Sequence, residues 1–225
     1  MPRAGRRGWS RFDAKKRKGW YYGNMKLLAA TTNPGKLREI MLVLGGHGVE
    51  LVSLQQFPEV PAPEETGKTF EENAVLKARY YFEHTGLPSL ADDGGLIVDA
   101  LNGLPGVNSH RWLGHEASDQ ELAEAVVKKL EGVPKEKRTA RLGGYLAFWD
   151  GVHLLTVSNY IKGYITEALP RDIDPGFPYR AVLVVPPYNK LYKDLTHEEH
   201  EAVNHRRKNL AELAPKIIEI VREKG

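Results

Sequence analysis

The sequence predicts an α/β protein built on a mixed β-sheet, and two observations carry this prediction. Strand and helix patterns alternate in the first half of the chain, and a hairpin pattern appears in the second half. Such alternation favours strands joined by helices, whereas a hairpin adds antiparallel pairing. With 225 residues, of which 41% are hydrophobic, the chain suits one domain of moderate size or two small lobes.

The first elements are a strand, a capped helix and a second strand. Pro34 suits the first turn of a helix, with Asn33 or Thr32 as its cap. Leucine, isoleucine and methionine then recur at helical spacing until Gly45-Gly46 ends the helix. The two strands are predicted over residues 26–30 and 49–53.

Three more helices are marked by a Thr or Ser followed three residues later by Glu, which is the capping-box pattern. The pairs are Thr69 with Glu72, Ser118 with Glu121 and Thr196 with Glu199. Gly86 and Gly132 end the first two helices. Pro215 is predicted to interrupt the last one before the apolar run 217–221.

The later strands are predicted over residues 142–149, 152–160 and 181–185. Asp150-Gly151, between the first two, is typical of a type I′ hairpin turn. The third strand is closed by Pro186-Pro187.

The net charge of +3 comes from residues 1–24, which carry eight basic residues and one acid. The remaining chain has 24 basic and 28 acidic residues. We expect this extension to be a disordered arm, or to result from an assigned translation start that lies too far upstream, with Met25 as the natural start. The alternative is a nucleic-acid-binding arm, because its Trp and Tyr residues could stack on bases. It lacks the apolar core of a secretory signal.

Composition excludes two classes of function. The chain has no cysteine, which excludes disulfides and thiolate chemistry and agrees with a cytoplasmic location. It also has no apolar run long enough to cross a bilayer, so we expect no membrane partner.

The run 91–107 is the most informative segment. Asp92 and Asp93 follow an apolar stretch and precede Gly94-Gly95, so we expect two carboxylates at the end of a strand, before a turn. Carboxylates in this position could hold a hard cation such as Mg²⁺. The alternative is a plain acidic turn.

Residues 31–36, Thr-Thr-Asn-Pro-Gly-Lys, predict a helix N-terminus that could bind an anion through its backbone N–H groups, with Lys36 adding a full charge. The spacing is not that of a Walker A loop. Taken alone, such a segment is more often an ordinary capped helix than a phosphate site.

Other polar groups are ambiguous on their own. Asn73 and Lys77 lie four apart and share a helix face. Glu64-Glu65 and Asn204-His205-Arg206 could be functional or simply solvated surface.

Taken in order, these segments resemble the ITPase or HAM1 family of house-cleaning nucleoside triphosphate pyrophosphatases, from about Met25 to the C-terminal helix. The resemblance implies a single catalytic domain over residues 25–225, with a long twisted sheet, helices on its faces and two lobes around a central cleft. It implies hydrolysis of ITP, dITP or XTP to a monophosphate and pyrophosphate, which cleanses the nucleotide pool. Mg²⁺ would be the cofactor, with Mn²⁺ as the alternative, and the protein would be a homodimer.

The resemblance also implies roles for individual residues. Glu65 and Asp93 would hold the metal, and Asp93 or Asp92 would help activate water. The substrate-binding residues would be Thr31, Thr32, Asn33, Lys36, Asn73, Lys77, Gly94 and Lys190 toward the phosphates, and Phe177, Tyr179, Arg180, His205 and Arg206 toward the base.

The chain departs from the family pattern mainly in the base loop, residues 176–181. Arg180 stands where the family has aspartate, and Pro178 restricts the loop. Gly94 and Asn204 each replace a serine. Base selectivity is therefore expected to be relaxed or redirected.

Two alternatives follow from these departures: a pyrophosphatase of the same fold with another base, such as a modified pyrimidine, or a nucleotide- or RNA-binding module without turnover. The retained Glu65 and Asp93 argue against lost catalysis.

Overall fold

The computed structural model describes residues 25–45, 47–109 and 112–223. The predicted basic extension, residues 1–24, lies outside the described residues. The strands are β1 (Met25–Ala29), β2 (Val49–Ser53), β3 (Ser89–Val98), β4 (Thr139–Trp149), β5 (Leu154–Ile165), β6 (Leu183–Val185) and β7 (Lys190–Leu191). The α-helices of the described part are α1 (Pro34–Leu44), α2 (Phe70–Thr85), α3 (Asp119–Lys129), α4 (His197–Val203) and α5 (His205–Glu223). Within those ranges, no helix combines the length and apolar character needed to span a membrane.

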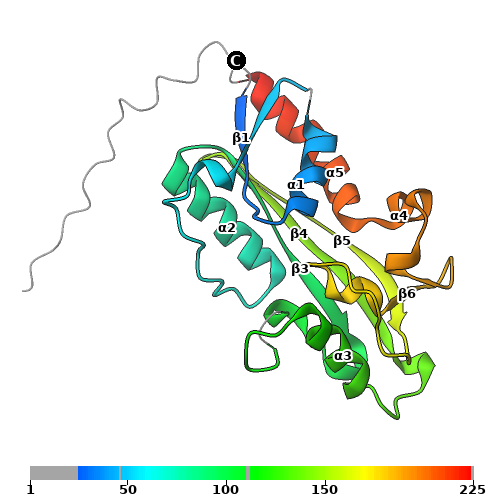
Figure 1. Cartoon of the computed structure of the whole chain (residues 1–225). Coiled ribbons are helices and arrows are strands. Elements are labelled where there is room, and N and C mark those ends of the chain that lie inside the picture. The colour runs from blue at the N-terminus through cyan, green and yellow to red at the C-terminus, as the bar shows by residue number, and fades with distance from the viewer. Residues whose placement is uncertain (1–24, 46, 110–111, 224–225) are drawn as a thin grey trace, which may run out of the picture.

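The strands form one seven-stranded sheet in the order β2-β1-β3-β4-β5-β6-β7. β1 pairs in parallel with β2 and β3, and the remaining pairs are antiparallel. The predicted α/β class and mixed sheet are therefore confirmed. The long strands β3, β4 and β5 run through the whole molecule (Figure 1).

Helices cover both faces of the sheet. α1 and α5 pack on one face through a core that includes Leu27, Leu90 and Leu146, while α2 packs on the other through a core that includes Leu28 and Ala91. α3 covers the far end of the long strands, where a third core includes Leu96, Val98 and Ile161 (Figure 1). The molecule thus has two apolar lobes joined by the long strands.

Between these lobes lies the acidic pair, and here the predicted strand end is wrong. Asp92, Asp93 and the two glycines after them lie inside β3, paired with β4 from Leu146 to Gly143. The sheet continues because glycine pairs with glycine: a Cβ on Gly94 would lie 2.5 Å from the Gly143 carbonyl oxygen. Since successive strand residues face opposite sides, Asp92 faces α1 and α5, and Asp93 faces α2.

Most predicted caps are confirmed. The Asn33 side chain caps α1, and Ser118–Glu121 and Thr196–Glu199 form complete capping boxes. At α2 the box is incomplete, because the Glu72 carboxylate accepts the N–H of Lys68 rather than that of the cap residue Thr69.

Two local predictions are wrong. α5 continues through Pro215, because apolar residues on both sides of it, such as Leu213 and Ile217, pack into the same core while Pro215 is exposed. The β4–β5 turn is not type I′. β5 begins only at Leu154, and the Asp150 carboxylate accepts the N–H groups of Val152 and His153.

Candidate active site

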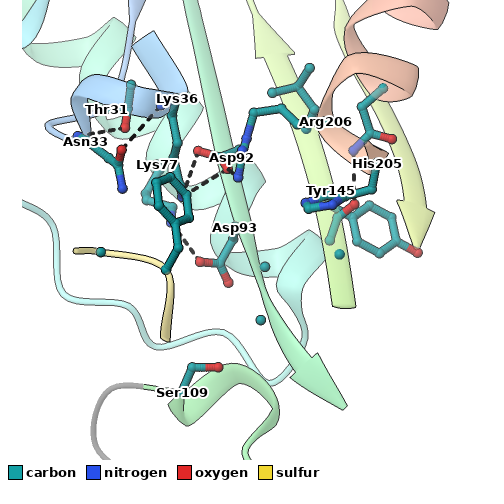
Figure 2. A pocket seen from close by; sticks show the side chains of 18 of the residues that line it. Thr31, Asn33, Lys36, Lys77, Asp92, Asp93, Ser109, Tyr145, His205 and Arg206 are labelled. Carbon is teal, nitrogen blue, oxygen red and sulfur yellow. Dashed lines mark hydrogen bonds and ion pairs between the residues drawn. The ribbon is translucent and has the colours of Figure 1, made fainter. Parts of the chain in front are cut away.

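A cavity of about 450 Å³ opens between the two lobes. The loop before α1, one face of α2, the acidic pair of β3, the glycines of β4, the segment 176–180 and the start of α5 all line it. Figure 2 shows polar side chains from these elements converging on the same space. The cavity therefore combines polar groups with the edges of the apolar cores, to which Leu146, Tyr81 and Tyr179 belong.

The first wall is the N-terminus of α1. The Asn33 Oδ1 accepts the N–H of Gly35 at 2.9 Å and that of Lys36 at 3.3 Å, and Thr31 Oγ1 accepts the N–H of Asn33 at 3.1 Å. These backbone donors are thus already satisfied, contrary to the expectation of free N–H groups. Attraction for an anion comes instead from the helix dipole and the Lys36 ammonium, which both favour negative charge.

Asp92 lies beside Lys36 and Arg206 (Figure 2), and together with Glu39 these residues form a charge-balanced cluster. Lys36 Nζ is 2.9 Å from Asp92 Oδ2, and Arg206 lies 3.2 Å from the same oxygen and 2.8 Å from Glu39 Oε2. Burial alone would raise the pKa of Asp92, but Lys36 and Arg206 outweigh it and hold the pKa well below its usual range. Two acids and two bases therefore neutralise one another here.

Asp93 lies in a second cluster that is not balanced. Lys77 Nζ is 2.8 Å from Asp93 Oδ1 (Figure 2) and 3.0 Å from Glu65 Oε1, while Asn73 donates to Asp93 Oδ2 at 3.2 Å. Two carboxylates share one ammonium, which leaves an excess negative charge. Burial raises the pKa of Asp93, and nearby Glu65 adds to this against the opposing charge of Lys77.

This second cluster is where a cation fits. The ammonium of Lys77 already lies between the carboxylates of Glu65 and Asp93, as a bound cation would. In the described part of the chain, no three His, Asp or Glu side chains gather as a complete metal cage. Two carboxylates with oxygens from a substrate are nevertheless the usual donor set for Mg²⁺.

The part of the cavity wall that packs against the N-terminus of α1 is aromatic. Phe177 lies against Gly35 of α1, where a Cβ would be 2.9 Å from its ring. Tyr179 is 5% exposed and its hydroxyl donates to the Ser109 carbonyl at 2.9 Å. The Arg180 guanidinium lies 3.9 Å from the ring centroid of Phe177. A flat apolar surface and one cation thus lie beside the N-terminus of α1.

The start of α5 completes the wall. The side-chain Oδ1 of Asn204 accepts the N–H of Arg206 at 3.0 Å, and its Nδ2 donates to Glu39 at 2.9 Å. His205 lines the cavity, and its Nδ1 is buried without a hydrogen-bond partner in the described structure. Burial, and then the nearby Arg206, lower the pKa of His205 well below its usual value.

Acid should therefore destabilise the protein in part through His205. Because its folded pKa is depressed, protons bind the unfolded chain first, so stability is lost as pH falls below the unfolded value of about 6.5. We expect His205→Gln to lose less free energy of unfolding between pH 7 and pH 5 than the wild type, measured by urea denaturation. The exposed His47→Gln should keep the wild-type pH dependence. Equal losses in wild type and His205→Gln would contradict this assignment.

The structure brings most of the predicted residues together. The cavity is lined by Thr31, Thr32, Asn33, Lys36, Glu65, Lys77, Asp92, Asp93, Gly94, Phe177, Tyr179, Arg180, His205 and Arg206. Asn73 lies behind this wall, where it also accepts the Gly67 N–H at 2.8 Å and so positions Asp93. Lys190 is not among the described lining residues and instead pairs with Glu199 at 2.7 Å.

Glu39, Ser109, Tyr145 and Asn209 belong to the site but were not predicted from the sequence. Glu39 could have been predicted from the sequence, because it lies three residues after Lys36 and shares its helix face. The others depend on long-range packing; Asn209 of α5, for example, donates to the Gly144 carbonyl of β4.

The model of the Ham1 family matches residues 27–216. The chain belongs to the Ham1 family. A relative named dITP/XTP pyrophosphatase in Geobacillus kaustophilus is 42% identical over 201 residues, which cover 89% of this chain and 98% of the relative. One of the same name in Geobacter sulfurreducens is 44% identical, covering 83% of this chain and 93% of the relative.

Solved structures of Ham1 proteins share the fold. The HAM1 protein of Coxiella burnetii matches with a TM-score of 0.77 and 33% identity, covering 87% of this chain and 99% of that one. A nucleoside-triphosphatase / dITP/XTP pyrophosphatase of Mycobacterium abscessus matches with a TM-score of 0.70 and 41% identity, covering 85% and 100%. The seven-stranded sheet and its helices are thus those of the Ham1 family.

Proposed function

We propose that this protein is a nucleoside triphosphate pyrophosphatase that hydrolyses non-standard purine nucleotides such as dITP, ITP and XTP to the monophosphate and pyrophosphate. The observation that carries the proposal is the pairing of two carboxylate clusters on opposite faces of β3, beside the N-terminus of α1. One cluster is neutral and the other has excess negative charge. The names of the relatives support the substrate class.

The phosphates bind along the α1 side. Lys36 is held in place by Asp92 and offers positive charge to the phosphates, and the helix dipole adds to it. Arg206, held by the same carboxylate, meets the edge of the base together with His205. Thr31, Thr32 and Asn33 supply side-chain donors. Asp92 is a positioning residue here, because its charge is committed to two cations.

Water is activated on the α2 side. Asp93 accepts a proton from water that attacks the α-phosphorus, and pyrophosphate leaves with its charge neutralised. Asn73 and Lys77 fix the orientation of the Asp93 carboxylate, at 3.2 Å and 2.8 Å respectively. Positioned acid–base groups of this kind contribute roughly 10²–10⁴-fold to rate.

Mg²⁺, with Mn²⁺ as the alternative, would be held by Glu65 and Asp93 together with phosphate oxygens of the substrate. The ion would neutralise phosphate charge and lower the pKa of water. Lys77, which lies between these carboxylates, offers its charge to the phosphates. Lys190 has a place in phosphate binding only if its pair with Glu199 opens.

Removing one carboxylate of the Glu65–Asp93 pair should weaken the binding of Mg²⁺. We expect Glu65→Gln to raise the Mg²⁺ concentration for half-maximal activity by about tenfold or more, the scale on which even outer-shell partners act. The measurement is a Mg²⁺ titration of initial rates at saturating ITP. Glu64→Gln is the matched control, because Glu64 is exposed and is not among the described lining residues. Equal Mg²⁺ requirements in both variants would remove Glu65 from the metal site.

The wider setting follows from the family. We propose that the protein acts as a homodimer on the cytoplasmic nucleotide pool, where it keeps damaged purines out of nucleic acids.

The substrate is tested with a nucleotide panel. Purified protein with Mg²⁺ is given ITP, XTP, dUTP, GTP or ATP, and pyrophosphate and orthophosphate are measured separately. Fast pyrophosphate release from ITP and XTP, and little from GTP or ATP, is the expected result. Release from dUTP alone would replace the substrate class, and binding without release would favour a non-hydrolytic module.

A further inference from the structure

In the aromatic part of the cavity wall, Arg180 carries a charge that no described carboxylate contacts closely. Against the effect of burial, Arg206 and also Arg180 lower the pKa of Glu39, but Glu39 is already paired with Arg206 at 2.8 Å. The Arg180 side chain is 19% exposed, and its nearest carboxylate in the described structure, on the half-exposed Asp174, is 4.0 Å away. No hydrogen bond links its guanidinium to another described residue. By contrast, the other cations of the cavity, Lys36, Lys77 and Arg206, each touch a carboxylate within 3.3 Å.

Aromatic contacts hold Arg180 in place. Its guanidinium lies 3.9 Å from the ring centroid of Phe177 and 5.3 Å from that of Tyr192. Tyr192 in turn stacks on His200 at 4.9 Å with an interplanar angle of 7°. A guanidinium packed on a ring face keeps its N–H donors in its own plane, free to bind an acceptor. The donors of Arg180 are thus fixed at the cavity wall without a close partner.

An under-neutralised, largely buried cation favours a ligand with negative charge, because burying charge without a partner is costly. The proposed function assigns the phosphates to Lys36 and Lys77. Arg180 packs on the ring of Phe177, a flat surface on which a base can stack, so the group that meets Arg180 belongs to the base. Among 6-oxopurines, xanthine loses a ring proton near neutral pH and becomes an anion, whereas hypoxanthine stays neutral. Xanthine also adds a second carbonyl acceptor.

We propose that Arg180 is a specificity-determining residue that makes this pocket prefer the anionic xanthine base over hypoxanthine. The proposal rests on the proposed function for its substrates, and it deepens that function by ranking them. Arg180 meets the base edge, and its charge adds binding energy only when the base carries negative charge.

The test compares XTP with ITP, which have the same sugar. In Arg180→Gln, the ratio of kcat/KM for XTP to that for ITP should fall about 10- to 100-fold, the scale of a lost hydrogen bond to a charged group. Arg180→Lys, which keeps the charge, should retain part of the preference. Arg171→Gln is the matched control, an exposed arginine nine residues earlier in the chain, and should leave the ratio unchanged.

The pH dependence of the XTP/ITP ratio distinguishes direct binding of the base by Arg180 from a merely structural role. In the wild type, the XTP/ITP ratio should fall as the pH is lowered and xanthine regains its proton, and this dependence should vanish in Arg180→Gln. The proposal would be overturned if Arg180→Gln lost kcat/KM equally for XTP and ITP, or if the wild type and Arg180→Gln showed the same pH dependence of the XTP/ITP ratio.

Binding of XMP and IMP by calorimetry separates this proposal from the proposed function. If the wild type binds XMP more tightly than IMP and Arg180→Gln does not, the proposal stands even where no nucleotide is hydrolysed. Suppose instead that pyrophosphate is released, but the wild type does not prefer XMP or Arg180→Gln keeps the same preference. The proposed function then holds, and Arg180 does not determine specificity.

Discussion

Asp93→Asn is expected to lower kcat for ITP by about 10³-fold while leaving the fold intact. Asparagine keeps the size of the side chain and can still accept a hydrogen bond from Lys77, but it can neither take a proton nor carry the charge that a cation needs. The effect should appear in kcat, because the group acts on the attacking water. Initial-rate measurements at saturating Mg²⁺ and ITP, with circular dichroism as the folding check, give the answer.

Two comparisons sharpen this result. Asp99→Asn is the matched control, since Asp99 is an exposed carboxylate just beyond the same strand, bonded to the Thr139 hydroxyl, and it should keep activity within about twofold. Asp92→Asn should act mainly on KM, because Asp92 holds Lys36 and Arg206 rather than water. A loss of kcat larger in Asp92→Asn than in Asp93→Asn would exchange the two roles.

Arg206→Ala is expected to destabilise the protein by about 3–5 kcal/mol, the usual effect of removing one partner from a buried ionic cluster. Arg206 is 7% exposed and contacts Asp92 at 3.2 Å and Glu39 at 2.8 Å, so its loss leaves Glu39 without a cation and Asp92 with Lys36 alone. For a chain of this length the melting temperature should fall by roughly 6–20 °C.

The double variant Arg206→Met with Glu39→Gln tests the cause. It removes the stranded carboxylate and fills the space, so it should regain part of the lost stability relative to Arg206→Ala. Lys208→Ala, at an exposed position two residues further along α5, should melt within about 2 °C of the wild type. If Arg206→Ala melts like Lys208→Ala, the buried cluster does not carry the stability assigned to it.

Individual strands and helix caps could be predicted, because they depend on residues that are neighbours in the sequence. β2 is found over the predicted residues, and Asn33 caps α1 as the polar–Pro pattern indicates. The predictions failed where distant residues decide the outcome. The Gly94-Gly95 pair is typical of a turn, but Gly143 and Gly144 face it across β4 and allow the strand to continue.

The site shows the same division. Charged residues on short motifs, such as Lys36 and Asp93, could be named from the sequence and are found together in one cavity. The charge balance among these residues could not be predicted, because it depends on a contact between Glu39 and Arg206, which are 167 positions apart in the sequence. Only the fold shows that Asp92 is neutralised by two cations while Asp93 and Glu65 share one.

We infer that this cavity cleaves the bond between the α and β phosphates. A ³¹P NMR time course of ITP with Mg²⁺ and the purified protein measures this, because each cleavage position gives different phosphorus resonances. We expect IMP and pyrophosphate to appear together in equal amounts, and neither to become detectable with Asp93→Asn over the same period. Appearance of IDP and orthophosphate instead would place the cleavage between the β and γ phosphates and rule out the proposed reaction.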